Sequence, residues 1–166
     1  MGLNNLLGGG FSMKKNESDL SAFKDAPALV LDDDSASRAI LIDFLHELGF
    51  KDITEMKSGD DALQFFEDHK DWRGIILCDW NMPNMSGTEF YTHVKKDKPD
   101  IPFIMVTGRN DEESVIHAKD NGIYAYILKP FSLTELERKI VTVSLKHSSF
   151  LFTPLASETM PPAYSI

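Results

Sequence analysis

The feature that most constrains the fold of this chain is a regular alternation of short apolar runs with amphipathic stretches, repeated five times. The apolar runs are rich in Ile, Leu, Val and Phe and are too short for helices, so they predict strands buried on both faces. The stretches between them place apolar residues at helical spacing. The sequence therefore predicts an α/β fold, a doubly wound five-stranded parallel sheet flanked by five helices.

Local signals set the ends of the predicted elements. Ser132 and Glu135 have the spacing of a capping box, and Gly122 suits a left-handed helix end. The first predicted helix has one apolar face, formed by Ile40, Leu41, Phe44, Leu45 and Leu48. Strands are expected at 28–31, 53–57, 74–78, 102–107 and 125–128, and helices at 35–48, 58–68, 87–96, 111–121 and 132–147.

Composition limits the classes of function. The formal net charge of −9 argues against a nucleic-acid binder, which would carry a basic face. No segment approaches the roughly 20 apolar residues that cross a membrane, so we expect no membrane insertion. Cys78, the only cysteine, lies inside an apolar run and is expected to be a small core residue. We therefore expect a cytoplasmic protein that binds other proteins or cations.

The chain divides into three parts. Residues 1–25 are expected to be a flexible N-terminal extension or leader, and residues 26–147 hold the predicted α/β domain. Residues 148–166 contain three prolines and several small polar residues, so we expect a mobile tail, too short for a DNA-binding domain. Three apolar residues of this tail could instead pack on the domain or on a partner, namely Phe150, Leu151 and Phe152.

Polar and charged side chains stand at the ends of four predicted strands. In chain order they are the acidic run 32–34, Asp79, Thr107 and Lys129. In such sheets ligands bind outside the carboxyl ends of the strands, so we expect these groups at one site. Taken alone, Asp79 fits three roles, those of a nucleophile, a metal ligand or a structural cap.

The combination favours phosphoryl chemistry. Carboxylates held close together repel one another and need a cation, and hard oxygen ligands with open water positions suit Mg²⁺. A lysine and a hydroxyl across from the metal can hold the remaining oxygens of a phosphoryl group. A carboxylate can also act as the nucleophile and form an aspartyl phosphate.

With these motifs the chain resembles the receiver domain of two-component response regulators, most closely the single-domain chemotaxis type. The similarity spans about residues 28–145. The resemblance implies a flavodoxin-like sheet with strand order 2-1-3-4-5. The motifs that carry it are LDDDSASR (31–38), CDWNMPNMSG (78–87), MVTG (105–108) and YILKPF (126–131).

The resemblance implies a role for each residue of the site. Asp79 would accept the phosphoryl group. Thr107 and Lys129 would contact that group, and the peptide bond between Lys129 and Pro130 would be cis. Mg²⁺ would be held by the acidic pair, by the phosphoacceptor and by one backbone carbonyl, that is by Asp32, Asp33, Asp79 and Asn81.

The resemblance also implies how a signal leaves the domain. On phosphorylation Thr107 would move toward the phosphoryl group and Tyr126 would turn inward. This would reshape the face formed by the predicted helix 111–121, the strand 125–128 and the last helix. The expected partners are a histidine kinase as phosphodonor and a downstream protein, with a monomer or a phosphorylation-dependent dimer as the oligomeric state. Residues expected on the binding face are Ile116, Lys119, Tyr124 and Tyr126.

Four residues near the predicted site are relevant to how this chain differs from the family pattern. Asp34 adds a third acid, for which we favour a helix-capping role over a metal ligand. Gly108 should keep the phosphoryl site open. Asn81 and Arg109 occupy positions that influence the access of water to the phosphoryl group, so we expect an altered phosphate lifetime.

Three other functions are weighed against a switch that catalyses only its own phosphorylation and dephosphorylation. A phosphorelay intermediate would use the same site. An aspartyl-phosphate hydrolase usually has a second acid two residues after the nucleophile, where this chain has Asn81, and no cap domain fits the length. A phosphate-independent scaffold is disfavoured because Asp33, Asp79, Thr107 and Lys129 are all present.

Overall fold

The computed structural model describes residues 20, 23–108, 116, 119–120, 122–123 and 125–152. Its strands are β1 (Ala28–Leu31), β2 (Ile53–Met56), β3 (Ile75–Asp79), β4 (Phe103–Thr107) and β5 (Tyr126–Leu128). Its helices are α2 (Ser35–Glu47), α3 (Gly59–Asp68), α4 (Gly87–Asp97), α6 (Leu133–Lys146) and α7 (Ser148–Phe152). Among these residues no helix is long and apolar enough to cross a bilayer.

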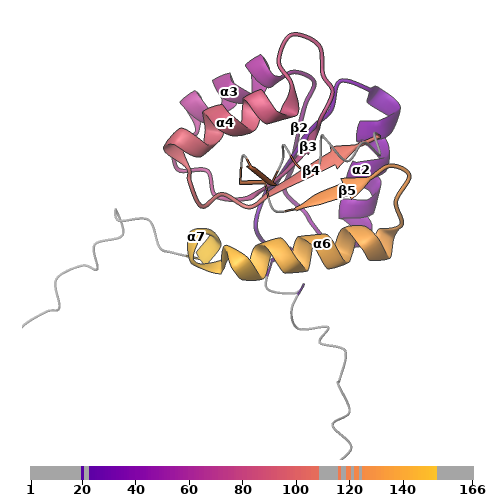
Figure 1. Cartoon of the computed structure of the whole chain (residues 1–166). Coiled ribbons are helices and arrows are strands. Elements are labelled where there is room, and N and C mark those ends of the chain that lie inside the picture. Colours follow the sequence, from indigo (N-terminus) through magenta and orange to yellow (C-terminus); the bar gives the residue numbers. More distant parts are fainter. Residues whose placement is uncertain are drawn as a thin grey trace, which may run out of the picture.

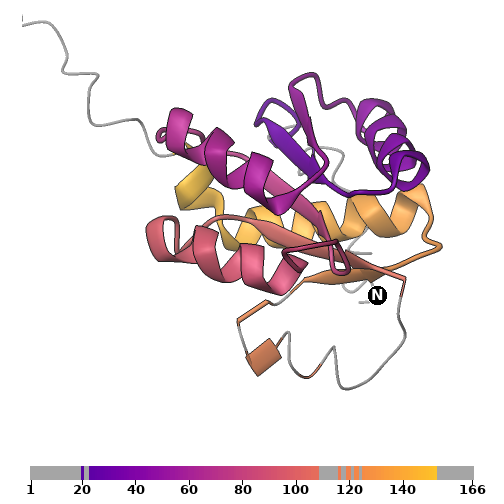
Figure 2. The same cartoon turned by 90° about the horizontal axis from the view of Figure 1, so that it is seen from above.

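The described strands form one parallel sheet in the order β2-β1-β3-β4-β5, which confirms the predicted fold class and strand order. In Figure 1, α3 and α4 cover one face of the sheet, while α2 and α6 cover the other. Figure 2 shows α3 and α4 lying side by side. The helix predicted at 111–121 lies largely outside the described residues, as do Arg109 and Tyr124, although residues 116 and 119–120 are helical.

The strand sequences explain the two cores. Along β1, Ala28 and Val30 pack in the core beneath α2 and α6, whereas Leu29 and Leu31 pack in the core beneath α3 and α4. Strands β3 and β4 alternate in the same way, and all residues of these three strands are buried. Burying one such Leu or Ile side chain stabilises the fold by about 1.5–3 kcal/mol. The well-buried central strands therefore hold the residues at their carboxyl ends in fixed positions.

Helix caps fall where the sequence places them. Ser132 and Glu135 form the predicted capping box on α6, and Asp34 caps α2 by accepting the Ser37 N–H at 2.7 Å. The apolar face predicted for α2 is narrower than expected, because Ile40 is 52% exposed while Leu41 and Leu45 are fully buried. Ile40 therefore lies at the exposed edge of the apolar face.

Residues on both sides of the predicted domain 26–147 pack against it. Before β1, Phe23 is buried and Leu20 packs against the core beneath α2 and α6. After α6, the helix α7 places Phe150 and Leu151 against the two cores. Arg73 donates a hydrogen bond to the Phe150 carbonyl at 3.0 Å and lies over its ring. Phe150 and Leu151 thus pack on the domain, as in the alternative left open for the apolar residues of this segment.

Candidate functional site

The register of the sheet brings the first and third strand ends together. Leu31 on β1 pairs with Cys78 on β3, so the next residues, Asp32 and Asp79, occupy neighbouring positions where both strands end. Each of Asp32, Asp33 and Asp79 offers a carboxylate oxygen, and these oxygens lie within 4.8 Å of one another. Asp32 and Asp79 are buried and Asp33 is exposed, so the cluster opens to solvent on the Asp33 side. This arrangement could hold a metal ion.

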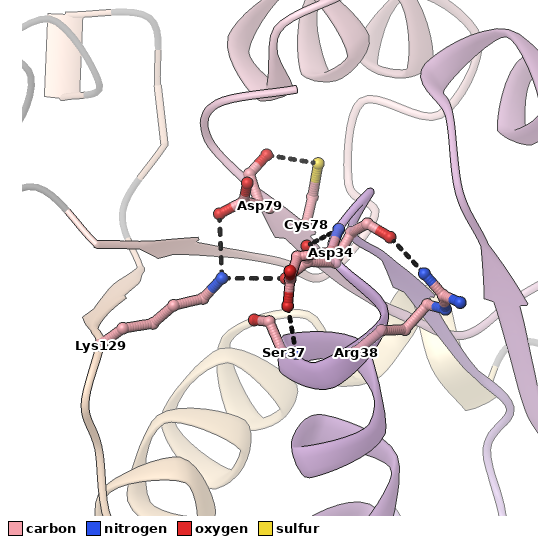
Figure 3. A network of polar contacts seen from close by, with 7 residues as sticks. Asp34, Ser37, Arg38, Cys78, Asp79 and Lys129 are labelled. Carbon is pink, nitrogen blue, oxygen red and sulfur yellow. Dashed lines mark hydrogen bonds and ion pairs between the residues drawn. The ribbon is translucent and has the colours of Figure 1, made fainter. Parts of the chain in front are cut away.

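Lys129 completes the cluster from the segment that follows β5 (Figure 3). Its ammonium donates to Asp32 Oδ2 at 2.9 Å and to Asp79 Oδ1 at 3.2 Å. The Lys129 N–H donates to the Thr107 carbonyl at 2.7 Å, which extends the β4–β5 pairing by one residue. The Lys129–Pro130 peptide bond is cis, as expected. The lysine therefore bridges the two buried carboxylates.

The charges of the cluster are unbalanced. Burial raises the pKa of Asp79, the ammonium of Lys129 acts against this rise, and the Asp32 carboxylate adds to it. For Lys129 burial acts to lower the pKa, but hydrogen bonds and charges from Asp32 and Asp79 outweigh it, so the net shift is upward. One ammonium thus faces three carboxylates, and the excess negative charge favours a bound cation.

The fourth strand places a hydroxyl beside the phosphoacceptor candidate. Asp79 pairs with Val106 on β4, so Thr107 lies one position further along the neighbouring strand, and it is 2% exposed. A β-carbon at Gly108 would have no heavy atom within 4 Å among the described residues, in line with the expected open site. By contrast, a β-carbon at Gly87 would overlap the Asp79 carbonyl oxygen. Glycine at 87 therefore lets α4 begin directly against the end of β3.

The remaining predicted residues lie around this cluster. Asn81 is exposed in the loop after β3, which closes through a hydrogen bond from Gly87 N–H to the Trp80 carbonyl at 2.8 Å. Tyr126 is half-buried in β5, and the Lys139 ammonium lies 5.4 Å from the centre of its ring. The backbone N–H of Asp34 donates to Asp32 Oδ1 at 2.9 Å, so Asp34 orients that carboxylate as well as capping α2.

Sequence reasoning missed one residue of the network, Arg38. Its guanidinium is buried, donates to the Asp32 carbonyl at 2.8 Å and pairs with Glu55 at 3.0 Å. A signal was present, since Arg38 shares its helical stripe with Leu41 and Leu45, at positions i, i+3 and i+7. A charged residue on a buried stripe indicates that another element supplies its partners.

Residues 28–141 match the family model described as the response regulator receiver domain. The chain belongs to the response regulator receiver family. Chemotaxis protein CheY1 of Helicobacter pylori (strain ATCC 700392 / 26695) is 35% identical over 117 residues, which cover 69% of this chain and 94% of CheY1. At this level of similarity the chain is a receiver domain of the CheY type, a phosphorylatable switch of two-component signalling.

Solved structures agree with this fold. Chemotaxis protein CheY4 of Vibrio cholerae is 26% identical with a TM-score of 0.64, and the match covers 72% of this chain and 98% of CheY4. A CheX–CheY–BeF₃–Mg complex from Borrelia burgdorferi contains a chain that is 21% identical with a TM-score of 0.66. That match covers 71% of this receiver and 88% of the other chain, and at this identity it shows the fold alone.

Proposed function

We propose that this receiver is switched by transfer of a phosphoryl group from a histidine kinase to Asp79, with Mg²⁺ bound beside it. The observation that carries the proposal is the cluster of three carboxylates within 4.8 Å, two of them bridged by Lys129. Phosphoryl transfer needs positioning and neutralisation of charge, and these groups supply both.

The chemistry assigns one role to each group. A carboxylate oxygen of Asp79 attacks the phosphorus of a phosphohistidine, the phosphorus–nitrogen bond breaks, and the imidazole leaves with a proton from solvent. The Lys129 ammonium, 3.2 Å from Asp79 in the resting state, turns to an oxygen of the new acyl phosphate. Thr107, buried on the adjacent strand, donates its hydroxyl to another oxygen.

The donor set fits Mg²⁺. The exposed Asp33 carboxylate and the carboxylate of Asp79 would bind the ion directly, with the Asn81 carbonyl, while Asp32 would hold its water ligands. When bound, Mg²⁺ would neutralise part of the negative charge involved in phosphoryl transfer.

An apolar hollow beside Lys129 supports docking of the phosphodonor. It has a volume of about 460 Å³ and is lined by Ser37, Ile40, Lys129, Pro130 and Phe131. A donor protein must bring its phosphohistidine to Asp79, and the exposed Ile40 offers an apolar contact next to that path.

If this hollow binds the donor protein, a change in it should affect phosphorylation by a histidine kinase but not by a small-molecule donor. Ile40→Asp should slow phosphorylation by a histidine kinase about tenfold or more, because a buried charge at an interface costs several kcal/mol. It should leave phosphorylation by acetyl phosphate unchanged. Leu145→Asp is the matched control, since Leu145 on α6 is also 52% exposed. Equal loss with both donors would show that Ile40 acts on the site itself.

For the output we propose that Thr107 and Tyr126 couple the phosphoryl group to a binding face. This face includes the exposed Ile116 and Lys119, which lie in the segment between β4 and β5, and the edge strand β5. Tyr126 is half-buried, the Lys139 ammonium lies 5.4 Å from the centre of its ring, and the ring would take a second position on phosphorylation. A downstream protein would distinguish the two positions of this ring.

Tryptophan fluorescence tests the core of the proposal. Trp80 follows Asp79 directly, whereas Trp72 packs with Phe65 and Phe66 next to α3, so Trp72→Phe isolates the Trp80 signal. We expect Mg²⁺ to change Trp80 emission and beryllofluoride, a phosphoryl mimic, to change it again. Asp79→Asn should abolish the second change. A folded protein that responds to neither addition contradicts the proposed switch.

A further inference from the structure

Arg38 connects three segments, namely α2, β2 and residues 32–34 after β1, which we call the acidic loop. Its side chain leaves α2, donates from Nη1 to the Asp32 carbonyl at 2.8 Å, and pairs through Nε with Glu55 on β2 at 3.0 Å. Only 7% of the residue is exposed. In Figure 3, Arg38 and Lys129 stand on opposite sides of the acidic loop. A guanidinium this buried is held in a fixed geometry by its partners.

Asp32 is fixed at each of its polar groups. Its N–H donates to the Met56 carbonyl at 3.2 Å, as the last bond of the β1–β2 ladder. Its carboxylate accepts from the Asp34 N–H and from Lys129 at 2.9 Å each. Its carbonyl points to Arg38 instead of continuing the ladder.

The carbonyl contact reaches the next residue through the peptide plane. Because the peptide unit is planar, fixing the carbonyl of Asp32 also fixes the N–H of Asp33 and the direction in which the Asp33 chain leaves. Asp33 is the exposed carboxylate of the cluster. The orientation of the Asp33 carboxylate toward the metal site therefore depends on the Asp32–Asp33 peptide, whose carbonyl accepts a hydrogen bond from Arg38.

We infer that Arg38 is a positioning residue for the Mg²⁺ site, acting through the Asp32–Asp33 peptide. The inference rests on the proposed function, since it concerns the same metal site. It does not make Arg38 a ligand, because a cation cannot bind Mg²⁺. Groups that hold metal ligands in place typically change metal affinity about 10–100-fold when removed.

Arg38→Lys distinguishes the effect of side-chain geometry from the effect of charge. Arg38→Lys keeps the positive charge but replaces a planar fork with a single ammonium, which cannot serve the Asp32 carbonyl and Glu55 in the same way. If geometry matters, Arg38→Lys and Arg38→Met should both weaken Mg²⁺ binding about tenfold. If only charge matters, the methionine variant should bind Mg²⁺ more tightly and the lysine variant should match the parent.

A third variant covers the case in which changes at the buried position 38 prevent folding. Glu55→Ala removes one anchor of the guanidinium from a side chain that is 59% exposed, so the protein should fold. We expect it to weaken Mg²⁺ binding roughly threefold, below the full loss of the positioning group. Arg73→Lys is the matched control, because Arg73 also donates a guanidinium hydrogen bond to a backbone carbonyl but does so at α7.

The experiment is a Mg²⁺ titration followed by Trp80 fluorescence in the Trp72→Phe background and by calorimetry, with urea unfolding measured in parallel. Weaker Mg²⁺ binding in the position-38 variants and Glu55→Ala, with Arg73→Lys unchanged, supports the inference. Lower stability with unchanged Mg²⁺ affinity overturns it, as does full retention of affinity by Arg38→Lys. Absence of Mg²⁺ binding by the parent would instead refute the proposed function, so the two failures are distinguishable.

Discussion

Replacing Lys129 with methionine removes the ammonium that bridges two buried carboxylates. In the folded protein this ammonium lies 2.9 Å from Asp32 and 3.2 Å from Asp79. The Asp32 side chain is 1% exposed and that of Asp79 is 11% exposed, so neither carboxylate can recover full hydration when its partner is lost. Without a metal ion, Lys129→Met should therefore destabilise the fold.

The size of the effect follows from these exposures. Removing one partner of a fully buried ion pair costs about 3–5 kcal/mol. The Lys129 side chain is 25% exposed and the cluster opens to solvent at Asp33, which lowers the expected loss to about 2 kcal/mol. With a urea dependence of about 2 kcal/mol per molar, the unfolding midpoint should fall by about 1 M.

Mg²⁺ should recover much of this loss, since a dication neutralises the carboxylates that Lys129 no longer contacts. A tenfold tighter Mg²⁺ affinity in the variant would add about 1.4 kcal/mol of stabilisation relative to the parent at saturation. The assay is urea unfolding of both proteins with EDTA and with excess Mg²⁺. Lys70→Met is the control, because its pair with Glu67 is exposed and should show no change in either condition.

Two results would refute the reasoning about Lys129. Equal midpoints for parent and variant in EDTA would mean that the ammonium does not stabilise the buried carboxylates. Equal stabilisation of both proteins by Mg²⁺ would mean that lysine and metal do not act on the same charges.

Four further substitutions test the packing around the site and within the domain. Gly87→Ala should cost about 1–3 kcal/mol, because its β-carbon would overlap the backbone of β3, whereas Gly108→Ala should change stability by less than about 0.5 kcal/mol. Equal urea midpoints for the two would contradict the close approach of α4. Ser144→Ala should raise stability by about 1 kcal/mol, because among the described residues its buried Oγ lacks a partner, and a loss on thermal unfolding would disprove this. Arg73→Ala should cost about 1–2 kcal/mol by releasing Phe150, and an unchanged unfolding curve would show that α7 adds nothing.

The fold could be predicted because its signals are local. Strand β1 lies at Ala28–Leu31 as expected, and α6 begins after Ser132, whose capping box with Glu135 is readable from spacing alone. The gathering of Asp79 and Lys129 followed from the rule that strand ends meet at one edge. Their distances depend on the register of three strands and could not be read from the sequence.

The features that sequence reasoning missed depend on contacts between residues far apart in the sequence. Arg38 is buried because Asp32 and Glu55 offer acceptors from other elements, while Ile40, one position around the helix from Leu41, falls beside the covered stripe. The prolines that predicted a mobile tail all follow residue 152, and Phe150 is held by Arg73 from a loop far away in the sequence.

The central claim is that Asp79 accepts the phosphoryl group, and its most direct test is chemical. The full chain is incubated with acetyl phosphate and Mg²⁺, and the product is analysed by intact mass and by reduction of the acyl phosphate with borohydride before peptide mapping. We predict one phosphoryl group per chain, located on Asp79, formed only with Mg²⁺ and absent from Asp79→Asn. Acid-labile phosphate that persists in Asp79→Asn, or that maps to Asp32 or Asp33 in the parent, would contradict the assignment.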